Sequence, residues 1–188
     1  MREDKIFRYI ERLANLIRNE MRSDGAEWGL QPVQLEALYY LSICNRYSDT
    51  PMGVTEYLGQ TKGTVSQTLK VLEKKGLISK LQDKNDKRVT HLEITGDGRS
   101  LLERSVPPSK LISACEELGD HTNQEIVEAL QKLLLAMQRI NEMKAFGVCK
   151  SCKYNAKLSD GGFFCNLTQE PLAEVEVELV CREYEDNG

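Results

Sequence analysis

The apolar positions of this chain recur every three or four residues in its first 76 residues, with interruptions that mark helix ends. Ile6, Ile10, Leu13 and Ile17 follow this spacing and predict an amphipathic first helix. Gly25 and Gly29 are expected to bracket a loop around Trp28. Three further helices are then predicted from Gln31-Pro32 to about Asn45, from Thr50-Pro51 to Gly59 and from Thr61 to Gly76, because each opens on a capping residue.

The pattern changes to alternation after Gly76, which predicts a β-hairpin. An extended run begins at Leu77-Ile78, turn-forming residues occupy 83–86, and alternation returns over 89–94. Helix is expected to resume after Gly98 and to break at Pro107-Pro108, since proline lacks the backbone donor. Thr122 to Glu125 has the form of a capping box and is expected to open the last long helix.

That last helix carries an apolar seam that requires a partner helix. Its apolar residues alternate at spacings of four and three, as in helices that pack lengthwise against one another. Pairing with the first helix across a dimer, or burial within the subunit, would satisfy it. The seam comprises Ile126, Leu130, Leu133, Met137 and Ile140.

The composition describes an ordinary globular chain of 188 residues, 40% hydrophobic and 29% charged. No apolar run is long enough to span a membrane, and the charged N-terminus is unlike a signal peptide, so we expect a cytoplasmic location. There is no phosphate-binding glycine loop and no nucleophile motif with a nearby histidine. The sequence therefore predicts a protein that is not an enzyme.

The net charge of −4 hides two opposed regions. Residues 61–90 hold eight basic and three acidic side chains, whereas residues 170–188 hold seven acidic ones and one arginine. Because phosphate binding depends on the local field, a basic segment beside an acidic tail is compatible with DNA binding. A solvated lysine-rich surface would give the same pattern.

The two short helices at 51–58 and 61–75 form a helix-turn-helix outline. On the second, the face opposite Val65 and Leu69 is polar and basic. A helix fits the major groove, so this face is expected to contact base edges and phosphates. Its candidate DNA-binding residues are Lys62, Thr64, Ser66, Gln67, Lys70 and Lys74, and those of the hairpin are Lys84, Lys87 and Arg88.

With these elements in place, residues 1–146 resemble the MarR family of winged-helix regulators. The hairpin matches the family pattern D-x-x-D-x-R-x-x-x-L-x-[LI]-T-x-x-G at every position, from Asp83 to Gly98. The resemblance implies a homodimeric transcription regulator, expected to be a repressor, that binds a pseudo-palindromic site on double-stranded DNA. It implies that helix 61–75 enters the major groove and wing 77–95 the minor groove, with Arg88 held there by Asp86. It also implies a pocket for a small-molecule effector, to which Trp28, Tyr39 and Tyr40 are candidate contributors.

The final segment, residues 147–188, is set apart by four cysteines. Cys149-x2-Cys152-x12-Cys165-x15-Cys181 in a chain expected to be cytoplasmic predicts metal ligands rather than disulfides. Four thiolates suit a structural Zn²⁺ ion or a [4Fe-4S] cluster, and the spacing leaves both open. Cys44 and Cys115 lie elsewhere and are expected to be ordinary buried cysteines.

The sequence thus predicts a mainly α fold with a small β-hairpin wing: a winged helix-turn-helix with long dimerisation helices over 1–146, and a small metal-bound, four-cysteine extension over 147–188. The predicted function is sequence-specific regulation of transcription, responsive to an effector or to the state of the cysteine site. The alternatives are a metal-bearing protein-interaction module and a redox carrier, neither of which would bind DNA.

Overall fold

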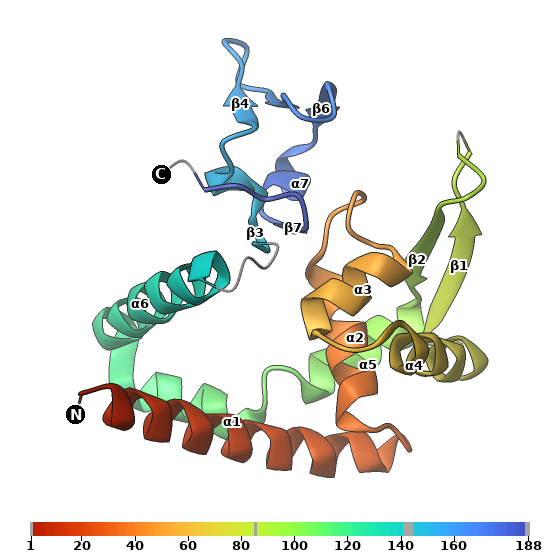
Figure 1. The fold of residues 1–188 in the computed structure, drawn as a ribbon. Helices are drawn as coiled ribbons and strands as arrows, with labels where there is room; N and C mark the ends of the chain where they lie inside the picture. The colour runs from red at the N-terminus through yellow and green to blue at the C-terminus, as the bar shows by residue number, and fades with distance from the viewer. Residues whose placement is uncertain (1, 85, 141–144, 187–188) are drawn as a thin grey trace.

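The computed structural model describes residues 2–84, 86–140 and 145–186 of the chain. It is mainly helical, with two long helices, a helix-turn-helix with a β-hairpin, and a small C-terminal part built from short strands (Figure 1). Within these residues, no helix combines the length and the apolar character needed to cross a bilayer.

The first four helices are present, and α2, α3 and α4 begin where the capping residues predict. They are α1 (Arg2–Glu27), α2 (Pro32–Ile43), α3 (Pro51–Leu58) and α4 (Lys62–Lys74). The Thr50 side chain accepts a hydrogen bond from Gly53 N, and Thr61 accepts one from Thr64 N. The expectation of a loop from Gly25 is wrong, because α1 continues two residues beyond that glycine.

The predicted hairpin is present as β1 (Ile78–Gln82) paired antiparallel with β2 (Thr90–Ile94). Leu92 points into the core and is 2% exposed. Helix α5 (Gly96–Ser105) starts two residues before Gly98, since Thr95 caps it by accepting from Gly98 N. It ends before the two prolines, as predicted.

The last helix, α6 (Ser109–Ile140), starts earlier than predicted. Its only non-helical residue is Gly119, with φ 76° and ψ 165°, a conformation that glycine adopts readily. The helical segment after Gly119 already includes Thr122, so the prediction that Thr122 opens the last helix is wrong. The break falls at the glycine because a left-handed backbone interrupts the helical hydrogen bonds.

The main core lies under the helix-turn-helix. Residues of α2, α3, α4, β2 and α5 pack together, and Leu35, Leu38, Tyr40, Val54 and Leu72 are fully buried in it. In contrast, α6 has no buried residue. The long helices α1 and α6 therefore leave most of their apolar side chains exposed.

The C-terminal module (residues 145–186) folds around two small apolar clusters. Leu172 and Val177 pack with Cys149 in one cluster, and Tyr184 packs with Cys152 and Cys181 in the other. One antiparallel sheet has the order β4-β5-β6, and β3 pairs with β7. The elements are β3 (Gly147–Val148), the 3-10 helix η1 (Cys149–Ser151), β4 (Asn155–Lys157), β5 (Phe163–Cys165), β6 (Glu170–Leu172), α7 (Glu174–Val177) and β7 (Val180–Cys181).

Candidate nucleic-acid interface and cysteine site

Helix α4 turns its polar side to solvent because its apolar side is locked into the core. Val65, Leu69 and Leu72 are at most 2% exposed, which fixes the rotation of the helix. All six side chains predicted to bind DNA from this helix are exposed: Lys62, Thr64, Ser66, Gln67, Lys70 and Lys74. Thr64 is also bound locally, with its Oγ1 3.0 Å from Thr61 Oγ1.

A groove of about 320 Å³ joins α4 to α3 and the hairpin. Lys62, Ser66 and Lys70 line it from α4, and Lys80 and Thr90 line it from β1 and β2. The structure thus brings α4 and the wing onto one surface. Lys80 was not among the predicted contacts, although it lies in the basic segment; only the folded hairpin turns it toward α4, where it forms an ion pair with Glu73.

At the wing, Asp86 holds Arg88 as the resemblance implied. Arg88 donates from Nε to Asp86 Oδ1 at 2.9 Å and from Nη2 to Oδ2 at 2.8 Å. These bonds lower the pKa of Asp86. The Arg88 side chain is 90% exposed, so it is oriented without being covered. Lys84 and Lys87 are exposed beside it, while the turn residue Asn85 lies outside the described residues.

The four predicted metal ligands line one small cavity of about 20 Å³ in the C-terminal module. Burial raises the pKa of the Cys149 thiol to about 12, and the neighbouring Cys181, Cys152 and Cys165 add to this shift. The thiols surround the cavity without closing on one point: as placed, no three His, Cys, Asp or Glu side chains of the described residues are grouped tightly enough to hold an ion. Cys44 is buried and Cys115 half-buried, and neither lines the cavity.

Two amides support this cavity. Asn155 Nδ2 donates to Cys149 O at 3.0 Å and lies 3.8 Å from its Sγ. Burial raises the pKa of the Cys181 thiol, while polar groups of Asn45, Glu183 and Ser48 oppose that shift. Asn45 belongs to the loop between α2 and α3, far from the cysteines in sequence, so no local motif signalled its part in the site.

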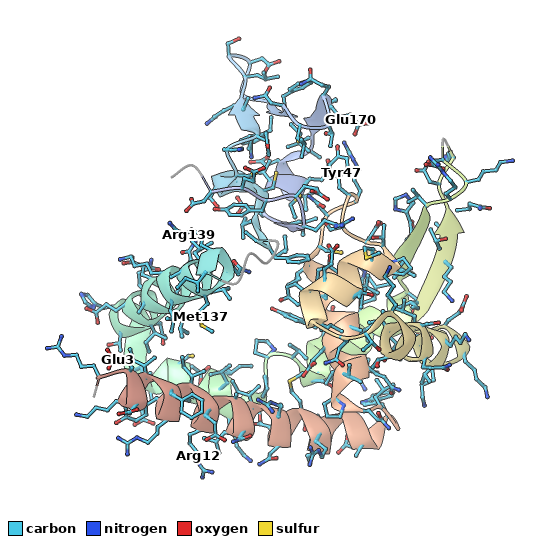
Figure 2. The ribbon with its side chains drawn as sticks, in the orientation of Figure 1. Glu3, Arg12, Tyr47, Met137, Arg139 and Glu170 are labelled. Atoms are coloured by element: carbon cyan, nitrogen blue, oxygen red, sulfur yellow. The ribbon has the colours of Figure 1, made fainter. Side chains whose placement is uncertain are left out.

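The C-terminal module is fastened to this loop by charged and polar contacts. Arg46 lies 2.8 Å from Glu176 and 3.2 Å from Glu170, and Tyr47 Oη donates to Glu170 at 2.6 Å. Figure 2 shows Tyr47 and Glu170 facing one another where the module meets the loop. A backbone hydrogen bond from Asn45 N to Val180 O at 2.9 Å completes the junction.

The aromatic residues considered for an effector pocket lie in different surroundings. Tyr40 is fully buried and donates through Oη to Ser48 O at 2.8 Å, so it is a core residue. Tyr39 and Trp28 are 38% and 42% exposed. Trp28 lines a pocket of about 310 Å³ together with Lys75 and Arg104.

Comparison with known proteins gives one consistent relationship. Residues 28–89 match the model of the MarR family. The chain is 26% identical over 137 residues to the transcriptional repressor MprA of Escherichia coli, covering 72% of this chain and 76% of that protein.

Solved structures share the fold. A MarR transcriptional regulator from Methanosarcina mazei superposes with a TM-score of 0.60 at 19% identity, over 73% of this chain and 99% of that one. MepR of S. aureus in its DNA-binding conformation also gives 0.60, at 23% identity, over 70% of this chain and 98% of that one. Residues 28–89 thus match the MarR family model, and the chain has a fold similar to that of a solved MarR transcriptional regulator.

Proposed function

We propose that this chain is a sequence-specific, double-stranded DNA-binding regulator of transcription. The observation that carries the proposal is the single surface formed by the basic face of α4 and the hairpin, with Lys62, Ser66 and Lys70 facing Lys80 across one groove. The match to a named transcriptional repressor supports repression as the mode of action and supports a chain that is not an enzyme.

The geometry suits reading of both DNA grooves. Helix α4 is fixed by its buried side, which leaves Gln67 free to pair with a base edge and the lysines to position the helix on phosphates. The wing holds an exposed arginine in a defined orientation, and narrow minor grooves attract arginine. We therefore place α4 in the major groove and the wing in the minor groove.

The operator is proposed to be pseudo-palindromic because the chain is proposed to act as a homodimer. Helices α1 and α6 expose apolar side chains that a single chain does not cover, and such contiguous surfaces mark interfaces. Those at least 48% exposed are Ile6, Phe7, Tyr9, Leu13, Leu16, Leu118, Val127, Leu130, Leu134, Met137 and Ile140.

A small-molecule effector that binds between the long helices is part of the same proposal. A pocket of about 500 Å³ lies between α1 and the first turns of α6. Leu13, Ile17 and Leu111 supply apolar walls, while Glu20 and Lys110 supply charge. A mixed lining of this size suits a drug-sized organic ligand.

The DNA proposal is tested by selecting double-stranded fragments from a random pool with the purified full chain. Fluorescence anisotropy then measures affinity for the selected fragment over a range of salt. We expect salt-sensitive binding that weakens about tenfold in Gln67→Ala and Lys70→Ala. Lys157→Ala, which changes another exposed lysine, on β4, is the matched control and should bind like the wild type. Unchanged binding in all variants would remove α4 from the interface, and no retained fragment would favour the interaction module or the redox carrier.

We further propose that Cys149, Cys152, Cys165 and Cys181 bind one thiophilic metal centre. Support comes from their placement around one cavity and from the amide that Asn155 directs at the sulfur of Cys149. Zinc and a [4Fe-4S] cluster both take four thiolates, and such a centre would join the separate strands of the module. Each bound thiolate requires loss of its proton, which the metal charge favours.

The two forms of the centre are separated by purification under anaerobic conditions. Broad absorbance near about 400 nm with stoichiometric iron identifies a cluster, whereas a colourless protein with one zinc per chain identifies a zinc site. Absence of both metals from protein expressed with iron and zinc supplied would overturn the proposal.

A further inference from the structure

The loop between α2 and α3 (residues 44–50) contacts the cysteine site at one end and the wing at the other. On the module side, Arg182 N donates to Ser48 Oγ at 2.9 Å, and Ser48 Oγ donates to Asn45 Oδ1 at 2.7 Å. Asn45 also lines the cavity that Cys181 lines. Asn45 and Ser48 are buried, at 2% and 0% exposure. The loop therefore forms part of the wall of the cysteine site.

On the wing side, Asp49 makes two contacts with β2. Its carbonyl oxygen accepts a hydrogen bond from Leu92 N at 2.7 Å, and its Oδ1 lies 2.6 Å from His91 Nδ1. The other ring nitrogen of His91 lies 3.2 Å from Asp83 Oδ2, next to the turn of the wing. Asp49 thus connects to the base of the wing and, through His91, to the residue at which the wing turns.

The loop between these contacts is tightly packed. Tyr40 Oη donates to the carbonyl of Ser48, and Ser48 N donates to the carbonyl of Asn45 at 2.9 Å. Gly53 packs so closely that a Cβ there would stand 2.1 Å from Ser48 O. Because closely packed interiors shift between discrete arrangements and do not deform continuously, movement of Asn45 and Ser48 is passed to Asp49.

We propose that Asp49 is a positioning residue for the wing, and that the C-terminal module sets the place of Asp49 through Asn45 and Ser48. This deepens the proposed function and rests on it, since the wing matters only if it meets DNA. An intact module holds the wing in the position, relative to α4, that lets both contact DNA. A loosened module releases Asp49, and the wing then loses its contacts with the minor groove while α4 keeps its own in the major groove.

The experiment compares Asp49→Ala, Asp49→Asn, Arg182→Ala and the double variant Asp49→Ala/Arg182→Ala in the full chain. Lys150→Ala is the control, because Lys150 pairs with Glu178 on the outer surface of the module. Anisotropy measures DNA affinity and its salt slope, and hydrogen exchange measures protection of the Leu92 amide. Thermal unfolding shows that each variant is folded.

For Asp49→Ala we expect affinity to fall about fivefold or more, with a shallower salt slope as wing contacts are lost. Asp49→Asn should keep most of the wild-type affinity, since the side-chain amide oxygen of the asparagine can still accept a hydrogen bond from His91. Arg182→Ala keeps the backbone N–H that bonds Ser48 but removes the side-chain pair with Glu56 and so loosens the module. It should reduce protection at Leu92 and weaken binding. The double variant should be no weaker than Asp49→Ala, because the loosened module acts on the wing through Asp49.

Three results would overturn the inference: Asp49→Ala binding like the wild type, Arg182→Ala leaving Leu92 exchange unchanged, or losses that multiply in the double variant. A wild-type chain that binds no DNA would instead remove the proposed function. In that case the exchange measurement still decides whether the module reaches the wing.

Discussion

The guanidinium of Arg182 binds both carboxylate oxygens of Glu56, from Nε at 3.1 Å and from Nη2 at 3.0 Å. The pair joins the C-terminal module directly to α3, the first helix of the helix-turn-helix. The side chains are only 19% and 27% exposed, so water screens the interaction incompletely.

Arg182→Ala should therefore loosen the module. We expect the free energy of unfolding to fall by about 1–2 kcal/mol, because a partly buried carboxylate loses a two-pronged partner. Chemical denaturation measures the loss, and limited proteolysis should cut the module faster than the rest of the chain. Arg182→Lys keeps the positive charge but cannot bind both carboxylate oxygens at once. Its stability should lie between that of the wild type and that of Arg182→Ala. Equal stability and equal proteolysis in Arg182→Ala would contradict the role given to this pair.

Arg88→Ala should lower affinity for the selected DNA about tenfold and relax sequence preference where the wing meets the minor groove. Asp86→Ala should cost less, because Arg88 keeps its charge and loses only its fixed orientation. Competition binding with fragments altered at the outer positions distinguishes the two variants. If Asp86→Ala proved the more damaging, the aspartate would have a further role in the turn, where its backbone N donates to Asp83.

The His91 contacts predict a pH dependence of stability. The hydrogen bond to Asp49 raises the pKa of His91 above its ordinary 6.5, contacts with Asp83 add to the shift, and burial opposes it. Burial raises the pKa of Asp49 despite the same bond, and nearby Glu93 adds to that rise. The His91 shift governs the pH dependence of stability here, because two carboxylates touch its ring. A raised folded-state pKa stabilises the fold fully below 6.5, and the contribution disappears as pH rises through the folded value.

The measurement compares unfolding of the wild type and His91→Gln between about pH 6 and pH 8.5, a range in which histidine titrates and most carboxylates do not. The wild type should be the more stable at the acid end, and the gap should close toward the alkaline end. A gap that is constant over this range would mean that His91 contributes packing and neutral hydrogen bonds only.

Leu130→Glu or Leu134→Glu on α6 should shift the chain from dimer to monomer, because a buried carboxylate at an apolar interface is costly to desolvate. Both leucines are more than half exposed in the single chain. Sedimentation analysis measures the mass, and DNA affinity should fall with it. Leu158→Glu, in the module, is the matched control at 42% exposure and should remain a dimer. Unchanged mass in both α6 variants would place the interface elsewhere.

Cys165→Ser should remove most bound metal and lower the melting temperature, since one ligand of four is lost. Cys115→Ser keeps all four cavity cysteines and should retain metal at the wild-type level. Metal analysis of both variants and of wild type treated with chelator makes the comparison. Equal metal content in Cys165→Ser and wild type would exclude Cys165 from the site.

The sequence predicted well where structure is decided locally. Thr50 and Thr61 cap helices because their side chains bond to backbone three residues away, and the Asp86–Arg88 pair spans two residues. The prediction of where the last helix starts was wrong. The capping pattern placed the start at Thr122, but the break in α6 lies at Gly119, whose positive φ interrupts the helix. The helix after the break starts directly behind Gly119, which places Thr122 within its first turn.

The sequence by itself determined the winged helix-turn-helix, its basic face and the four cysteines, because periodicity, caps and motif spacing act over a few residues. Only the tertiary structure decided that the cysteine site shares a wall with the α2–α3 loop and that Asp49 ties this loop to the wing. Asn45 and Cys181 meet across more than a hundred positions. Contacts of that kind depend on how whole elements pack, and no local pattern specifies them.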